Sequence, residues 1–278
     1  MDHLPSGVYQ YHELVKTIGR TGLDRLVRDK QARAVRRGWY AVGDPPAADL
    51  AAVQRGGVIG CVSALRRHGV WTPEDHRSHV RGNSSALRVR KGPFCRQFRR
   101  PEPEYGLIDE VPIALRHAAR CLDDEGFVVV CDSILNKRLM DREQIEYQFR
   151  DAPHRIRQLI DRCDERAESG PESMTRLRLQ NQHIGVRPQV QIDGVGRVDL
   201  LIGRWLIIEI DSWEFHGDRA HFQSDRTRDV DAHDRGFYPL RFTYEDIVHR
   251  WRETNPKILR AIRCGVHLRP HRPDAIPL

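Results

Sequence analysis

Two apolar runs separated by only three residues constrain the fold of this chain more than any other feature. They lie at residues 198–202 and 206–210, and each is apolar apart from one acidic residue. Runs without polar alternation are typical of central strands that helices cover on both faces. If residues 203–205 form a tight connection, the two runs pair directly, with Asp199 opposite Glu209. The sequence therefore predicts an α/β domain around these strands.

The flanking segments extend this pattern. Helical spacing and strand-like runs follow in the order α, β, β, β, α, β, α. The expected elements are a helix at 172–183, strands at 186–192, 197–202 and 205–211, a polar helix at 219–235, a strand at 237–242, and helices at 244–251 and 256–263. This domain is expected to span residues 168–278.

Carboxylates interrupt the apolar strands. Asp199 and Glu209 lie within them, and burial of an ionised carboxylate is costly unless it is paired or binds a metal. Glu209 and Asp211 point to the same face because side chains alternate along a strand. We therefore predict that Asp199, Glu209 and Asp211 converge on Mg²⁺ or Mn²⁺, which prefer oxygen ligands.

These residues resemble a nuclease family. The spacing Asp199-x9-Glu209-x-Asp211 is similar to the core of the PD-(D/E)XK superfamily. The order of further elements over about residues 168–255 resembles its DUF559 branch, which is similar to very-short-patch-repair endonucleases: Glu209-Ile210-Asp211, His216, Asp225-x-x-Arg228, Gly236-Phe237 and Leu240-Arg241-Phe242. The resemblance implies a restriction-endonuclease-like α/β domain with a mixed central sheet.

The resemblance also implies roles for individual residues. Asp199 and Glu209 would hold the catalytic metal, with Glu172 on the preceding helix as a further acid. Glu172 is equally suited to a capping box with Ser169. Asp211 stands where the superfamily usually has lysine, so another base or cation is needed.

His216 is the best candidate for a general base, because it follows Asp211 closely and imidazole accepts protons near neutral pH; His221 is a weaker candidate. Arg228 shares a helix face with Asp225, and either binds phosphate or forms an ordinary ion pair. Trp213 and Phe215 are suited to base stacking or to packing on the sheet.

The N-terminal residues 1–45 predict a winged helix-turn-helix. Two short helices divided at Gly19 precede two strand-like runs around Arg36-Arg37-Gly38. That segment, continued by Trp39-Tyr40, resembles the winged-helix domain of abortive-infection antitoxins of the AbiEi type. The predicted DNA-binding residues are Arg25 and Arg28 with Lys30 on the second helix, and Arg33, Arg36 and Arg37 on the wing. Such basic faces are also commonly just solvated.

Charge is unevenly distributed along the chain. Residues 1–100 carry 19 Lys and Arg against 8 Asp and Glu, whereas residues 101–278 carry 27 against 31. The basic first third is expected to meet a polyanion, with DNA as the partner. Residues 46–167 predict a mixed, largely helical region, in which the basic segment 81–100 either extends the nucleic-acid surface or forms a solvated strand and loop.

The six cysteines show no Cys-x-x-Cys pair and no zinc-like spacing with histidine, so reduced cytosolic thiols are expected. No apolar run approaches the roughly 18 residues that span a bilayer, and the start lacks the features of a signal peptide. We expect a cytoplasmic protein without membrane association; a dimer is compatible with the sequence, which does not itself define the oligomeric state.

Together these features predict a Mg²⁺- or Mn²⁺-dependent DNA endonuclease in a repair or defence role. The alternative is a non-catalytic, DNA-binding regulator or antitoxin-like protein that keeps the nuclease fold as a scaffold. A nuclease acting on RNA or on damaged or mismatched duplex is a third reading.

Overall fold

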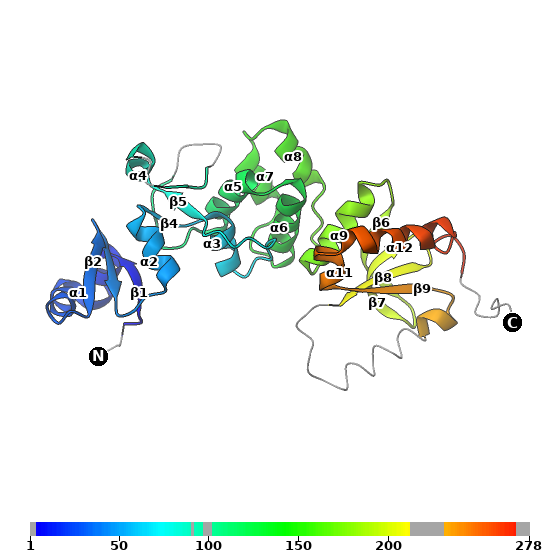
Figure 1. Ribbon diagram of the computed structural model, residues 1–278, viewed down its shortest axis with the longest axis horizontal. Coiled ribbons are helices and arrows are strands. Elements are labelled where there is room, and N and C mark those ends of the chain that lie inside the picture. Colours follow the sequence, from blue (N-terminus) through cyan, green and yellow to red (C-terminus); the bar gives the residue numbers. More distant parts are fainter. Residues whose placement is uncertain (1–3, 90–91, 97–101, 212–230, 271–278) are drawn as a thin grey trace. The chain divides into compact units, whose positions relative to one another are not determined.

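The computed structural model describes residues 4–89, 92–96, 102–211 and 231–270. The chain is a mixed α/β protein, as expected, and divides into two compact units (Figure 1). The first unit comprises Met1–Val130 and Arg138–Arg162, and the second comprises Cys131–Lys137 and Cys163–Leu278.

The N-terminal part of the first unit combines a small sheet with a broken helix. β1 (Gly7–Gln10) pairs with β3 (Trp39–Val42), and β3 pairs with β2 (Ala32–Arg36), all antiparallel. α1 (Tyr11–Arg28) is interrupted at Gly19, whose φ of 70° and ψ of 167° are not helical. Glycine tolerates this conformation because it has no Cβ. The helix–break–helix–hairpin order therefore matches the prediction, with β1 as an additional strand.

The next part of the first unit contains a buried ion pair. They are α2 (Ala47–Gln54), β4 (Gly57–Ile59), α3 (Cys61–Arg67), β5 (Val80–Gly82) and α4 (Ser84–Val89). Arg81 donates from Nε and Nη2 to the two carboxylate oxygens of Asp109 at 2.7 and 2.6 Å, and both side chains are buried. The first arginine of the basic segment 81–100 therefore lies inside the protein.

Helices complete the first unit: α5 (Val111–Cys121), the start of α6 (Asp124–Asn136), α7 (Arg142–Phe149) and α8 (His154–Asp161). The helical stretch expected from Asp141 to Cys163 is divided in two. Pro153 precedes α8 as its N-cap residue, where a missing backbone N–H is tolerated.

The second unit is built on a four-stranded mixed sheet. Its elements are α9 (Gly170–Gln180), β6 (Val186–Ile192), β7 (Gly196–Ile202), β8 (Leu206–Asp211), β9 (Tyr238–Thr243), α11 (Tyr244–Val248) and α12 (Trp251–Arg263). The strand order is β6-β7-β8-β9, with β8 and β9 parallel and the other neighbours antiparallel. The four strands and the mixed sheet confirm the predicted pattern.

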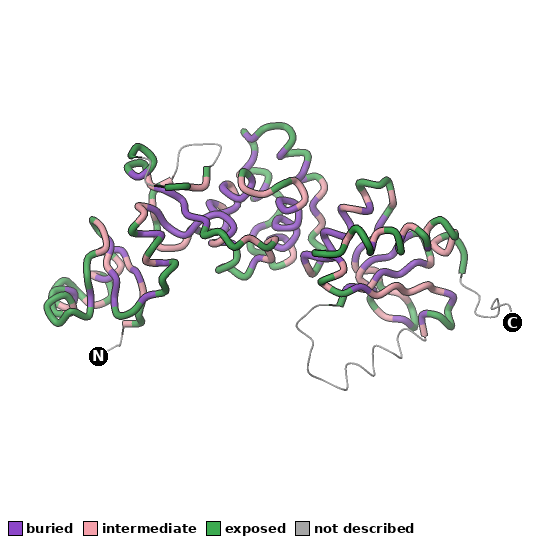
Figure 2. The backbone as a smooth tube through the Cα atoms, in the orientation of Figure 1, coloured by how far each residue is buried: buried purple, intermediate pink, exposed green. Residues whose placement is uncertain are grey.

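The centre of this sheet is almost entirely buried, as the tube coloured by burial shows (Figure 2). Leu200 and Leu201 point to opposite faces of β7, and both are buried. On α9, Arg178 donates to the backbone carbonyl of Ile247 at 2.6 Å and stacks over Trp251. These contacts tie α9 to α11 and α12.

Candidate active site

The register of the sheet places Asp199 and Glu209 side by side. Leu200 pairs with Ile208, and the connection between β7 and β8 is the three residues 203–205. The ladder ends at this pair, and continuing its register by one residue sets Asp199 opposite Glu209. Both residues are half-buried, at positions where the neighbouring strand residues are fully buried.

Gln189 on β6 occupies the position that faces Asp199 from the other side. Its neighbours Pro188 and Val190 pair with Leu200 and Val198, whereas Gln189 itself has a φ of 52°. This left-handed conformation is uncommon for a residue other than glycine, and such strain is concentrated at functional sites. The distortion takes Gln189 out of the regular ladder.

The amide of Gln189 joins two carboxylates. Its Nε2 donates to Glu172 Oε2 at 2.8 Å and to Asp199 Oδ1 at 3.4 Å. The other oxygen of Asp199, Oδ2, accepts the backbone N–H of Ile210 at 2.8 Å. A polar arrangement thus runs from α9 through β6 and β7 to β8. We call Glu172, Gln189 and Asp199 the carboxylate–amide cluster.

Glu172 lies at the start of α9 and is only 4% exposed. Ser169 caps the helix by accepting the Glu172 N–H, but the Glu172 carboxylate accepts the N–H of Glu168, one residue before the cap. Burial, and then the negative charge of Asp199, raise the pKa of Glu172 to about 7. Glu172 therefore does more than cap a helix: it carries a proton that neutral pH or a nearby cation can remove.

Buried polar contacts fix the helix that carries Glu172. Asp132 Oδ2 accepts from Ser173 Oγ at 2.6 Å and from Arg176 Nη2 at 2.7 Å. Asp132 Oδ1 accepts the backbone N–H of Asp164 at 2.7 Å. All of these side chains are buried, so breaking any one contact would leave an unpaired polar group. The start of α9 is therefore held rigidly.

Asp211 pairs with a cation on the neighbouring strand. Its side chain is 54% exposed and forms an ion pair of 3.3 Å with Arg241 on β9. Arg241 is also the register partner of Glu209 on the parallel strand β9. A guanidinium therefore occupies the edge of the site, close to where the resemblance leads one to expect a lysine.

The three acids predicted as metal ligands do not form one tight group. Among the described residues, no set of three carboxylates has its oxygens all within 4.8 Å of one another. The prediction that Asp199, Glu209 and Asp211 converge on a metal stays a prediction. The two carboxylates that one amide joins are Glu172 and Asp199, whereas Asp211 forms an ion pair with Arg241 on β9.

Several predicted residues lie outside the described part of the chain. These are His216, Arg228, His221, Asp225, Trp213 and Phe215, all within residues 212–230. Their predicted roles stay predictions.

The predicted DNA-binding residues of the first unit differ in their surroundings. Arg25, Arg28, Arg33 and Arg37 are exposed. The Arg36 guanidinium, in contrast, forms an ion pair with Glu104 at 2.7 Å and stacks on the Trp39 ring at 4.9 Å. Both contacts stabilise the fold of the first unit. These contacts give Arg36 a structural role, and the prediction that it also contacts phosphate stays a prediction.

The sequence alone did not single out Gln189 or a cluster of three cysteines and one histidine. Gln189 could be found only from the register across β6 and β7, because nothing in its local sequence singles it out. Four residues of the first unit bring their sulfur or nitrogen atoms together, although the spacing gives no zinc pattern: Cys61, His79, Cys95 and Cys121. We call them the Cys3His cluster.

Comparison of the chain with protein family models, with curated proteins and with solved structures gave no match. Within the described residues, no helix has the length and apolar character needed to cross a membrane. Function is therefore inferred from residues and geometry.

Proposed function

We propose that this chain is a Mg²⁺- or Mn²⁺-dependent nuclease that hydrolyses phosphodiester bonds in DNA. The observation that carries the proposal is the carboxylate–amide cluster within an otherwise apolar sheet. Two carboxylates share one amide nitrogen, and the negative charge of one raises the pKa of the other. This repulsion disfavours ionisation of Glu172, and a bound cation would relieve it.

The donors fit a hard divalent cation. Glu172 and Asp199 offer carboxylate oxygens on both sides of the Gln189 amide, and Glu209 is the next residue in the register. Mg²⁺ is usually held by one or two carboxylates, keeps several waters and also binds substrate phosphate. Two close carboxylates with a third nearby suit that pattern.

The residues of the chain would divide the work as follows. Glu172 and Asp199 hold the metal, which when bound supplies Lewis-acid activation of the phosphate and of the attacking water. Gln189 fixes the two carboxylates relative to each other. Arg241 would supply the positive charge that a lysine at position 211 would otherwise supply. Its guanidinium would stabilise negative charge on the phosphate. The predicted base remains His216.

Binding of DNA is assigned to the basic first third of the chain. Exposed arginines at the N-terminus would contact phosphates without reading sequence. Phosphate contacts supply affinity, whereas the carboxylates of the second unit supply chemistry.

The test is a cleavage assay on duplex DNA, single-stranded DNA and RNA, with Mg²⁺, Mn²⁺ or EDTA. We expect metal-dependent cleavage of DNA by the wild type and its loss in Asp199→Ala and Glu209→Ala, both of which should still bind DNA. Full activity in either variant would refute the assignment. Metal-dependent cleavage of RNA alone would keep the chemistry and change the substrate. DNA binding by the wild type without cleavage of any substrate would favour the regulator.

A further inference from the structure

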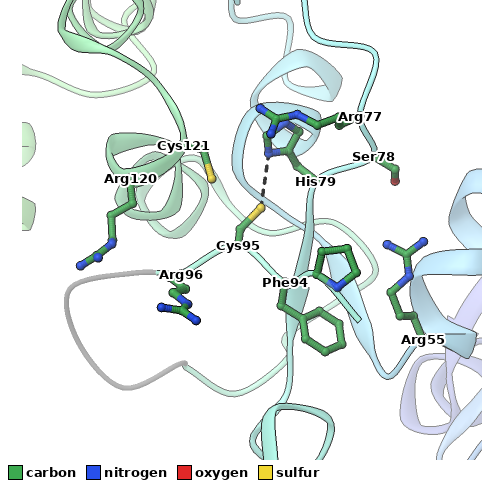
Figure 3. Close-up of a pocket in the computed structure, with 10 residues that line it drawn as sticks. Arg55, Arg77, Ser78, His79, Phe94, Cys95, Arg96, Arg120 and Cys121 are labelled. Atoms are coloured by element: carbon green, nitrogen blue, oxygen red, sulfur yellow. Dashed lines mark hydrogen bonds between the residues drawn. The ribbon is translucent and has the colours of Figure 1, made fainter. Parts of the chain in front are cut away.

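The Cys3His cluster lies in the first unit and plays no part in the proposed nuclease chemistry. Its members come from four separate segments. Cys61 begins α3, His79 directly precedes β5, Cys95 lies in the segment after α4, and Cys121 ends α5. One ligand atom from each lies within 4.8 Å of all the others. Figure 3 shows the Cys95 sulfur directed toward the His79 ring and the Cys121 side chain beside them.

The spacing of these atoms fits one small, tetrahedrally bound ion. Zinc bonds of about 2.3 Å to sulfur and about 2.0 Å to nitrogen place two sulfurs about 3.8 Å apart and a sulfur about 3.5 Å from the nitrogen. The distance between Cys95 Sγ and His79 Nδ1 is 3.3 Å, and 4.8 Å bounds the remaining separations. The cluster therefore needs only small adjustments to accept a metal.

The tautomer of His79 is the one that a metal ligand requires. Its Nε2 lies 2.9 Å from Asp75 Oδ2, and because a carboxylate only accepts, Nε2 carries the hydrogen. The lone pair of the neutral ring is then on Nδ1, which points at the sulfurs. Asp75 is itself held by Arg77, whose Nη2 donates to Asp75 Oδ2 at 2.7 Å. A carboxylate that orients a ligating histidine is a regular feature of zinc sites.

The backbone around the cysteines is also specifically arranged. Cys61 has a φ of 53°, an uncommon conformation for a residue with a Cβ, and its side chain is buried. The Cys95 N–H donates to Val80 O at 2.9 Å, and His117 Nδ1 donates to Cys95 O at 3.1 Å. Both of these contacts hold Cys95 at the cluster.

We propose that the Cys3His cluster binds one Zn²⁺ ion in a closed, structural site. Three thiolates and one imidazole form a soft ligand set that selects zinc over Mg²⁺ or Ca²⁺. Four protein ligands leave no position for substrate, so the site holds the fold together. The bound ion would fasten the Cys95 segment and His79 to α3 and α5.

The surroundings suit a zinc site. The bound cluster would carry a net charge of −1, and the adjoining pocket of 520 Å³ is lined by Arg55, Arg77, Arg96 and Arg120. The same pocket is lined by His79, Cys95 and Cys121 and gives an ion or a chelator a route to the ligands. Figure 3 shows these side chains around the pocket.

The first experiment measures the zinc content of the full chain, purified without a histidine tag and under reducing conditions. Elemental analysis should find one zinc per chain after gel filtration. Cys121→Ser should lower the content at least tenfold. Cys264→Ser, at an exposed cysteine outside the cluster, should retain it, as should Glu172→Gln in the second unit. Full zinc in Cys121→Ser would overturn the proposal.

A second measurement on the wild type covers the case in which the Cys121 variant does not fold. A mercurial reagent should release the zinc as three thiols react, and Co²⁺ added after removal of the mercurial should give the sulfur-to-cobalt charge-transfer band and the strong visible bands of a tetrahedral thiolate site. A reduced wild type that contains no zinc and takes up neither Zn²⁺ nor Co²⁺ would refute the site. So would a disulfide between two cluster cysteines in the protein as isolated under reducing conditions.

Discussion

Replacement of Glu172 by glutamine tests the electrostatics of the carboxylate–amide cluster without involving DNA. Glutamine has the shape of a protonated glutamic acid, and its amide oxygen can still accept from Gln189 Nε2 and from the Glu168 N–H. The variant removes only the ability to ionise. Its effect on stability should therefore depend on pH.

The size of the effect follows from the pKa of Glu172, which rises from 4.5 to about 7 on folding. Between these pH values the folded protein keeps a proton that the unfolded chain has released, so stability falls as pH rises and levels off above about pH 7. At about 1.4 kcal/mol per pKa unit, the wild type loses about 3 kcal/mol across this window relative to Glu172→Gln.

Hydrogen exchange of peptides covering β7 and β8, measured in EDTA and corrected for the intrinsic pH dependence, reports the opening free energy of the second unit by itself. The wild type should lose protection with rising pH, and Glu172→Gln should lose about 3 kcal/mol less. Glu165→Gln, at an exposed glutamate of the same unit, should behave like the wild type. Parallel curves for wild type and Glu172→Gln would refute the reasoning. Restored protection on addition of Mg²⁺ to the wild type would support it further.

Four further variants test other parts of the structure. Arg241→Ala should slow single-turnover DNA cleavage about 10²- to 10³-fold with little loss of metal binding. An unchanged rate would show that Arg241 does not replace the lysine usual at position 211. Replacing Arg33 and Arg37 by Ala should weaken the salt dependence of DNA binding measured by fluorescence anisotropy. The slope of log binding constant against log salt concentration should become shallower by about 0.9 for each lost phosphate contact. Arg36→Ala should instead lower the unfolding temperature and leave that slope unchanged. Asp75→Asn should weaken zinc affinity about 10- to 100-fold in chelator competition. An unaltered affinity would show that Asp75 does not orient His79 for metal binding.

The parts of the fold that the sequence predicted well depend on local signals. Two apolar runs with a three-residue connection define β7 and β8 and also their register, because a short hairpin allows few pairings. Gly19 ends one helical segment for a purely local conformational reason. The expectation of a mixed sheet, in contrast, came from the family resemblance.

The parts that escaped prediction depend on contacts between distant residues. Arg36 looks like an exposed basic residue of a wing, but its partner Glu104 is 68 residues away. The ion pair between Asp211 and Arg241 joins two strands that are distant in the sequence, so no local pattern predicts it. Gln189 becomes significant only when β6 is aligned with β7.

The Cys3His cluster shows the same limit most clearly. Its members are far apart in the sequence and come from two helices and two connecting segments, so no spacing rule for zinc applies to them. Packing of α3 against α5 brings Cys61 and Cys121 together. Only the tertiary structure turns apparently isolated thiols into a candidate ligand set.

The central claim is that the carboxylate–amide cluster holds the divalent metal that cleaves DNA, and Mn²⁺ binding measured together with cleavage tests it most directly. In the wild type, Mn²⁺ affinity by electron paramagnetic resonance should rise about tenfold from about pH 6 to about pH 8, because a proton on Glu172 competes with the metal. Asp199→Asn should lose Mn²⁺ binding and cleavage together, and Glu165→Gln should keep both. Cleavage by Asp199→Asn at the wild-type rate, or cleavage by a wild type that binds no Mn²⁺ at this site, would contradict the account.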